Sequence, residues 1–148
     1  MKKIIENIIS PEEAEQMRID FPPKFFMFIE EYEKDPFSQG ANKVLAAIKS
    51  ELGCVLPKSY LKAEGNGLYD WHVDTGNNNH MPWCTHGCSL LLSKDFEGGM
   101  LEYRDGSSFK RPLDLMIHTR DVEHRVTETT SGDRHVFLLF LRIGVGMI

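Results

Sequence analysis

The chain has 148 residues, enough for one domain with a sizeable core and too few for a second domain of ordinary size. Its 41% apolar and 26% charged residues are typical of a soluble globular protein. A net charge of −5 disfavours general binding to nucleic acid, although Arg104, Lys110 and Arg111 leave a local basic path open. No apolar stretch approaches about 20 residues, no signal-peptide pattern is present, and the three cysteines are an odd number. We therefore expect a cytoplasmic protein with reduced thiols and no membrane contact.

The first third of the chain has the pattern of helices. A short strand is predicted over residues 3–9, and Ser10-Pro11-Glu12-Glu13 has the features of a helix start that Pro22-Pro23 then ends. A second helix is predicted from about Lys24 to the residue before Asp35-Pro36, with an apolar stripe of Phe25, Phe28, Ile29 and Tyr32. A third is predicted from about Gln39 to Leu52, with Val44, Leu45, Ile48 and Leu52 facing inward and Gly53 ending it. Such stripes indicate packing against the outside of a sheet.

After Pro57 the apolar pattern shifts toward a period of two and turn residues become frequent, which is typical of β structure. We therefore expect one domain over residues 1–148, in which residues 1–56 are a helical support region and residues 57–148 form a β core. The longest polar loop is Gly76-Asn77-Asn78-Asn79-His80, a candidate for a mobile lid.

Candidate metal ligands follow the start of this β region. His72 and Asp74 are two residues apart, so on an extended strand their side chains project to the same side. With His124 they make two imidazoles and one carboxylate, the set that binds ferrous iron and leaves the opposite face of the metal open. A lone His-x-Asp occurs often by chance, and each residue alone would be interpreted as an ordinary core or surface residue.

The order of the following segments adds specificity. Cys88-Ser89-Leu90-Leu91-Leu92-Ser93 is followed by Asp95-Phe96-Glu97-Gly98-Gly99 and Leu113-Asp114-Leu115-Met116-Ile117, then Glu123-His124-Arg125-Val126 and the run from Gly132 to Phe140 that contains Arg134. From about Tyr60 to Arg142, this order resembles the Fe(II)/2-oxoglutarate-dependent dioxygenases, and within them the prolyl 4-hydroxylase-like branch. The resemblance implies a mainly β fold with N-terminal helices, a double-stranded β-helix (a jelly-roll or cupin-like barrel) flanked by about three α-helices.

The resemblance also implies the chemistry. His72, Asp74 and His124 would be the catalytic iron ligands, and Arg134 would grip the far carboxylate of 2-oxoglutarate, for which a planar guanidinium is suited. O₂ would be the oxidant, with ascorbate as an additional reductant in some members. The reaction would be hydroxylation of an unactivated C–H bond with conversion of 2-oxoglutarate to succinate and CO₂, and the carboxylate of Asp74 favours hydroxylation over halogenation. The alternative for Arg134 is a structural ion pair with a carboxylate such as Asp114 or Glu128.

One departure from the family precedes the metal motif. Several relatives have a tyrosine just before a Gly-Asn-Gly turn, where it contacts 2-oxoglutarate, and here the corresponding position before Gly65-Asn66-Gly67 is assigned to Ala63. Tyr60 is out of phase with Ala63 in a strand, so it cannot simply replace it. Ser89, the cofactor-binding candidate beside Arg134, or His86 or Thr119 would supply the contact. His118 stands where relatives have an apolar aromatic, and we interpret it as a hydrogen-bonded core histidine rather than a cosubstrate contact.

A rival metal site is conceivable nearby. His80, Cys84, His86 and Cys88 lie within nine residues, and thiolates and imidazoles are ordinary zinc ligands. The usual pair of ligands in a tight turn is missing, however, and Cys88 opens an apolar run in which a free cysteine acts as a small apolar residue. We therefore favour packing over zinc for these thiols.

The substrate is the least determined part. A prolyl residue of a peptide or protein is the first expectation, with Tyr69, Trp71 and Trp83, and also Met81, as candidates for the substrate groove. A free amino acid or another small metabolite is the alternative substrate class, and a non-catalytic jelly-roll module that only binds metal is the alternative function class. The oligomeric state is left open.

Overall fold

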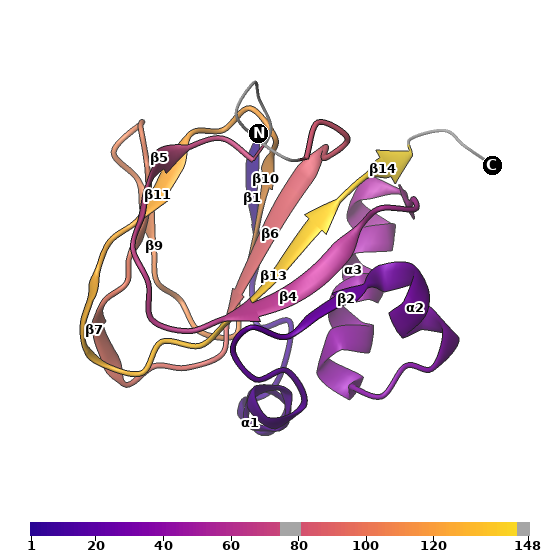
Figure 1. Ribbon diagram of the computed structural model, residues 1–148, viewed down its shortest axis with the longest axis horizontal. Helices are drawn as coiled ribbons and strands as arrows, with labels where there is room; N and C mark the ends of the chain where they lie inside the picture. Colours follow the sequence, from indigo (N-terminus) through magenta and orange to yellow (C-terminus); the bar gives the residue numbers. More distant parts are fainter. Residues whose placement is uncertain (75–80, 145–148) are drawn as a thin grey trace.

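Antiparallel strands form most of the structure, a computed structural model that describes residues 1–74 and 81–144 (Figure 1). The helices are α1 (Pro11–Asp20), α2 (Ile29–Lys34) and α3 (Gln39–Leu52). The strands of the first half are β1 (Lys2–Ile5), β2 (Phe26–Phe28), β3 (Cys54–Val55), β4 (Tyr60–Glu64) and β5 (Tyr69–His72). Those of the second half are β6 (His86–Leu91), β7 (Phe96–Gly98), β8 (Leu101–Tyr103), β9 (Ser108–Phe109), β10 (Leu115–Thr119), β11 (His124–Val126), β12 (Thr129–Gly132), β13 (Val136–Leu141) and β14 (Ile143–Gly144).

The strands form two layers. One is a six-stranded sheet in the order β1-β10-β6-β13-β4-β2, and the other contains a four-stranded sheet, β5-β11-β8-β9, beside the pair β12-β7. A further pair, β14-β3, continues from the end of β13. Figure 1 shows α2 and α3 on one side of the six-stranded sheet, with β5, β11, β9 and β7 on its other side. The two layers face each other without closing into one continuous barrel, and the space between them holds the candidate site.

Alternation along the strands gives the six-stranded sheet two different faces. Its helix-facing side chains include Leu61, Ala63, Cys88, Ile117 and Leu139, all 3% exposed or less. They pack with Met17 of α1 and with Val44 and Ile48 of α3 in the main core. A smaller cluster of Leu101, Tyr103, Phe109, Met116 and Val126 lies between the two layers. The helices therefore cover one face with apolar contacts, and the opposite face is free for polar groups.

Two of the predicted helices are confirmed. At the start of α1, the Ser10 hydroxyl accepts a hydrogen bond from the backbone N–H of Glu13 (3.1 Å), and the Glu13 carboxylate accepts one from the N–H of Ser10 (2.9 Å). This is the capping box that the sequence predicts. The helix α3 begins after Ser38, whose hydroxyl accepts from Ala41 N–H, and it ends at Leu52 before Gly53, as predicted.

The second predicted helix is wrong over its first part. Residues 26–28 form β2, which pairs with β4, and the helix α2 begins only at Ile29. Phe25 and Met27 pack toward the helices while Phe26 and Phe28 are exposed on the other face, so this apolar run has a period of two. A short apolar run fits both periods, and pairing with β4 decides between them.

The N-terminal region is not wholly a helical support. Its predicted first strand is present as the shorter β1, which pairs with β10, and β2 adds a second strand to the same sheet. Residue 57 is therefore not a boundary between helices and sheet. The predicted lid, residues 76–80, lies outside the described residues. None of the described helices is long and apolar enough to cross a membrane.

Candidate metal centre

The three predicted metal ligands come together at one end of the space between the layers. Strand pairing sets His124 of β11 directly opposite His72 of β5, and Asp74 follows β5 by two residues. One ligand atom from each residue lies within 4.8 Å of the others. The imidazole ring centroids of His72 and His124 are 4.4 Å apart. The β5–β11 ladder thus joins residues that are 50 positions apart in the sequence, as a shared metal requires.

Backbone carbonyls fix the orientation of both imidazoles. The Nδ1–H of His72 donates to the carbonyl of Asp70 (2.7 Å), and the Nδ1–H of His124 donates to the carbonyl of Val122 (2.8 Å). Because a carbonyl oxygen only accepts, Nδ1 carries a proton in each ring, and in the neutral ring Nε2 has the lone pair that a metal would take. Such hydrogen bonds are typical of histidines that bind a metal through Nε2.

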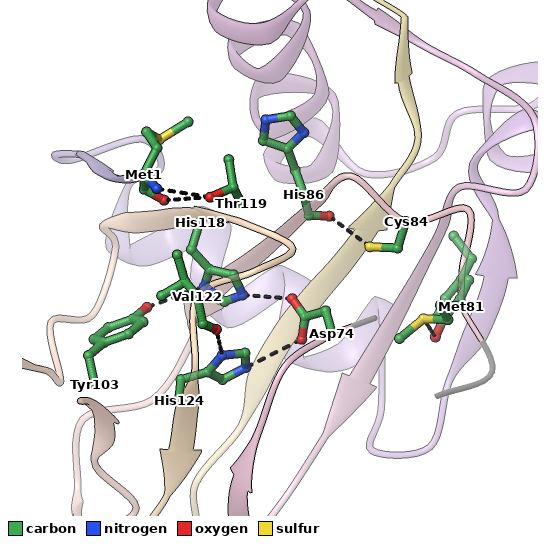
Figure 2. Close-up of polar contacts among 11 residues, drawn as sticks. Met1, Asp74, Met81, Cys84, His86, Tyr103, His118, Thr119, Val122 and His124 are labelled. Carbon is green, nitrogen blue, oxygen red and sulfur yellow. Dashed lines mark hydrogen bonds and ion pairs between the residues drawn. The ribbon is translucent and has the colours of Figure 1, made fainter. Parts of the chain in front are cut away.

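Asp74 is held by histidines on both of its oxygens. His118 Nε2 lies 2.7 Å from Asp74 Oδ2, and His124 Nε2 lies 3.3 Å from Oδ1 (Figure 2). Burial alone would raise the pKa of Asp74, but the hydrogen bonds from His118 and His124 outweigh it and lower the pKa below the usual range. Burial lowers the pKa of His118, so that ring is neutral and donates from Nε2–H, while its Nδ1 lies 3.3 Å from the Tyr103 hydroxyl.

These contacts fit a divalent cation. Oδ1 of Asp74 and Nε2 of His124 face each other at 3.3 Å, and two lone pairs at that distance repel unless a proton or a cation lies between them. Burial lowers the pKa of His124, but the contact with Asp74 outweighs it and raises the pKa, so a proton is favoured there in the metal-free protein. A divalent ion would replace that proton.

His118 has a role that the sequence analysis did not assign. The expectation of a hydrogen-bonded core histidine agrees with its 4% exposure, but its partner is the candidate ligand Asp74. Gly87 lies beneath this pair, and a Cβ atom there would come within 2.2 Å of Asp74 Oδ2 and 2.7 Å of His118 Nε2. Glycine is needed because the carboxylate approaches the β6 backbone so closely. The signal in the sequence was a histidine directly after the apolar run Leu115-Met116-Ile117.

Arg134 lines the same cavity as the three candidate ligands. This cavity has a volume of about 210 Å³, and its lining also includes Ser89, Tyr69, Met81, Leu138 and Phe140. Arg134 is 5% exposed, and its Nε has no hydrogen-bond partner among the described residues. Its Nη1 donates only a long hydrogen bond to the carbonyl of Gly65 (3.4 Å). Of the two carboxylates considered for a structural ion pair, Asp114 binds Arg111 instead (2.8 Å), and no ion pair joins Glu128 to Arg134.

Ala63 was assigned to the position at which relatives have a tyrosine that contacts 2-oxoglutarate, and this assignment is wrong. Ala63 is 1% exposed and packs in the helix-facing core, so it cannot contact a ligand in the cavity. The cavity-facing residues of β4 are Tyr60, Lys62 and Glu64, which were not chosen as site residues. Of the three proposed replacements only Ser89 lines the cavity, while His86 contacts Thr85 and Thr119 contacts Met1. The period of two in β4 predicts the two faces but not which one meets the helices.

The substrate candidates are distributed over different surfaces. Tyr69 lines the cavity and is 41% exposed. Trp71 lies outside the cavity lining, where its ring contacts the guanidinium groups of Arg104 (3.9 Å) and Arg125 (4.8 Å), and this position argues against its predicted contribution to the groove. Trp83 packs edge-on against Tyr60, with ring centroids 6.0 Å apart. Met81 lines the cavity, and its sulfur lies 3.0 Å from the Tyr60 hydroxyl.

Among the described residues, the thiols of the rival zinc site are not part of any group of three or more metal-binding side chains. Cys88 packs in the helix-facing core, and Cys84 Sγ donates to the carbonyl of His86 (3.4 Å). Burial raises the pKa of Cys84 to about 11. His80 lies outside the described residues. The packing role that the sequence favoured is therefore confirmed for Cys88.

Comparison with solved structures identifies the fold. No protein-family model and no curated protein sequence matches the chain. A prolyl-4-hydroxylase from Pseudomonas putida superposes with a TM-score of 0.70 at 13% identity, covering 97% of this chain and 93% of that one. A viral collagen prolyl hydroxylase from Paramecium Bursaria Chlorella virus-1, described as a 2OG complex, gives 0.70 at 12% identity, with 97% and 96% covered. A prolyl 4-hydroxylase from Phytophthora capsici gives 0.69 at 18% identity, with 97% and 59% covered. The chain therefore has the mainly β, jelly-roll fold of the prolyl 4-hydroxylases, as the resemblance in its sequence implies.

Proposed function

We propose that the chain is an Fe(II)- and 2-oxoglutarate-dependent dioxygenase that hydroxylates an unactivated C–H bond and converts 2-oxoglutarate to succinate and CO₂. One observation carries the proposal. A single cavity holds two imidazoles oriented by backbone carbonyls through Nδ1, an ionised carboxylate within 4.8 Å of them, and a buried guanidinium whose Nε lacks a partner among the described residues. The first three groups fit a divalent metal, and the fourth fits a carboxylate of a small ligand.

Each protein group has a defined task in this mechanism. His72 and His124 would bind the iron through Nε2 and Asp74 through Oδ1, while His118 holds Oδ2 and so fixes the carboxylate plane. Arg134 would orient 2-oxoglutarate by its far carboxylate. Leu101, Val126, Leu138 and Phe140 line the cavity with apolar groups and limit the access of water. The bound iron would supply the oxidative chemistry with O₂.

A peptide is the favoured substrate, because an aromatic strip extends from the cavity to the sheet edge. Phe26 and Phe28 of β2 are 52% and 46% exposed, and the Phe26 ring lies 4.7 Å from that of Tyr60, which lines the cavity. Such a strip extends beyond the reach of a free amino acid and suits apolar side chains, prolines included, of a polypeptide. The exposed strip therefore supports a prolyl hydroxylase-like activity on a peptide or protein over hydroxylation of a small metabolite.

Spectroscopy and product analysis test the reaction class. Anaerobic addition of Fe(II) and 2-oxoglutarate should give a weak visible charge-transfer band, and admission of O₂ should release succinate slowly even without substrate. Screening peptide and metabolite pools for the gain of one oxygen atom would then identify the substrate class. No described residue indicates a role for ascorbate, so the same assay is run with and without it.

The same assay separates the enzyme from a binding module. A module that only binds metal would take up iron without the band and without succinate under any condition. Stoichiometric zinc that resists chelation, with no succinate, would replace the oxygenase proposal by a metal-stabilised module.

A further inference from the structure

The unpaired state of Arg134 needs an explanation, because a carboxylate lies nearby. Glu64 lines the same cavity, yet no ion pair joins it to the guanidinium within 4.0 Å among the described residues. Burial lowers the pKa of Arg134, and the negative charge of Glu64 opposes that shift, so the two groups interact electrostatically. A buried arginine beside a glutamate would ordinarily pair with it, since an uncompensated buried charge is costly.

Lys62 explains why this pair does not form. Lys62 and Glu64 are two residues apart on β4 and face the same side, and Lys62 Nζ lies 2.5 Å from Glu64 Oε1. Their side chains are 30% and 18% exposed, and both residues line the cavity. Tyr69 also interacts with Glu64. Burial raises the pKa of Tyr69, and the neighbouring carboxylate of Glu64 raises it further. The carboxylate of Glu64 is thus engaged by Lys62 and by Tyr69, and it forms no ion pair with the guanidinium.

The charges at this end of the cavity sum to one free positive charge. Lys62 and Arg134 contribute +2 and Glu64 contributes −1, so one ligand carboxylate would make this end neutral. Without the ammonium of Lys62 the sum would already be zero, and Arg134 would be the remaining cation with which Glu64 could pair. A ligand carboxylate would then have to displace an internal ion pair before it could bind.

We propose that Lys62 is a positioning residue for the cosubstrate: by holding Glu64, it keeps the guanidinium of Arg134 free for the far carboxylate of 2-oxoglutarate. This inference rests on the proposed function for the identity of the ligand. It assigns a role to two cavity-lining residues of β4, Lys62 and Glu64.

Calorimetric titration of 2-oxoglutarate into the Mn(II)-loaded protein tests the proposal without turnover. Lys62→Met should weaken binding by about tenfold or more, whereas Lys62→Arg should stay near wild type because it keeps the ion pair with Glu64. Glu64→Gln should bind as tightly as wild type or more tightly. The double variant Lys62→Met/Glu64→Gln should recover to within about threefold of wild type, because the competitor is removed along with its partner. Lys43→Met, which removes an exposed ion pair with Glu13, is the matched control.

Two binding outcomes would overturn the inference. If Lys62→Met binds normally, Lys62 does not control Arg134. If the double variant binds as weakly as Lys62→Met alone, Lys62 acts on the ligand directly and not through Glu64. Melting curves from circular dichroism establish that each variant is folded before its affinity is interpreted.

A crystal structure of the ligand-free Lys62→Met variant gives a second readout that does not depend on 2-oxoglutarate. Glu64 is expected to form an ion pair with Arg134, and a carboxylate that stays away from Arg134 would contradict the exchange of partners. If the exchange occurs but wild-type protein binds no 2-oxoglutarate, the proposed function fails while the role of Lys62 toward Arg134 stands. If wild type binds 2-oxoglutarate and all four variants bind it alike, only this inference fails.

Discussion

The two faces of the six-stranded sheet are built from alternate residues of the same strands, yet they differ in chemistry. The helix-facing side has Leu61, Cys88, Ile117 and Leu139, and the cavity-facing side has Lys62, Ser89, His118 and Leu138 at adjacent positions in the chain. Apolar contacts with the helices hold the sheet from one side. Polar and charged groups can therefore gather on the other side without loss of the fold, and substitutions on the two faces should have separable effects.

The largest effect on stability is expected on the helix face. Leu139 is fully buried there, so Leu139→Ala should lower the free energy of unfolding by about 2 to 5 kcal/mol through lost contacts and a residual cavity. Leu138→Ala, on the half-buried cavity face, should cost only about 1 kcal/mol. Urea unfolding of both variants measures the difference, and equal losses would mean that the two faces contribute alike.

The largest effect on the cavity face is expected at the metal ligands. His72→Ala, Asp74→Ala and His124→Ala should each weaken Fe(II) binding by at least about 100-fold, while the helix-side core keeps the variants folded. Anaerobic metal titration with circular dichroism measures both properties. The double variant Cys84→Ser/Cys88→Ser is the control, since it should lose stability but keep the iron affinity. A ligand variant with wild-type affinity would remove that residue from the set.

Removal of the guanidinium should affect the cosubstrate and not the metal. Arg134→Ala should weaken 2-oxoglutarate binding by about 30-fold or more, and Arg134→Lys should recover only part of it because an ammonium cannot form two parallel hydrogen bonds. Calorimetry on the Mn(II)-loaded protein is the measurement. Arg111→Ala, which breaks the ion pair with Asp114 outside the cavity, should bind normally. Normal binding by Arg134→Ala would show that the carboxylate binds elsewhere.

A pair of glycines sharpens the comparison of the faces. Gly87→Ala should displace Asp74 and His118 and weaken Fe(II) binding by about 10-fold, because its Cβ would overlap Asp74 Oδ2. Gly40 of α3 is equally crowded, but its Cβ would meet the flexible side chain of Met17 on the helix side. Gly40→Ala should therefore lower thermal stability and leave the metal affinity unchanged. Loss of iron in both variants would argue that the two sides are coupled.

The sequence predicted what short-range patterns and residue order determine. The helices α1 and α3 followed from their capping residues and periodicity, and the three candidate ligands with Arg134 followed from their order along the chain. The start of α2 could not be predicted, because Phe25–Phe28 fits a helix or a strand until β4 is placed beside it. The assignment of the relatives' tyrosine position to Ala63 failed for a similar reason. Only the packed helices determine which face of β4 turns away from the cavity.

The contacts among the polar groups were also beyond the sequence. His118 was recognised as a buried histidine, but its bond to Asp74 depends on β10, on β6 and on the absence of a side chain at Gly87. Lys62 and Glu64 resemble solvated surface charges in the sequence, and only the facing layer turns their strand face into a cavity wall.

The smallest predicted effect is a pH dependence on the helix side. His135 is 9% exposed, and its Nε2–H donates to the carbonyl of Phe21 (2.7 Å). Burial lowers the pKa of His135 below its ordinary value near 6.5. The unfolded chain therefore binds more protons than the folded protein between the two pKa values, so stability falls as the pH drops through about 6.5 and levels off below the folded pKa. His86 and His118 act in the same direction and His124 in the opposite one, because their pKa values are lowered and raised respectively.

The contribution of His135 can be isolated by substitution. In His135→Asn, which has no group that titrates in this range, the loss of unfolding free energy between about pH 8 and about pH 5 should be smaller than in wild type. Urea unfolding of the metal-free proteins across this range measures both slopes. Because His135 lies against Phe21 on the helix side, the variant should bind Fe(II) as wild type does. Identical slopes would mean that His135 is protonated as readily in the folded protein as in the unfolded chain, and that its burial does not oppose the charge.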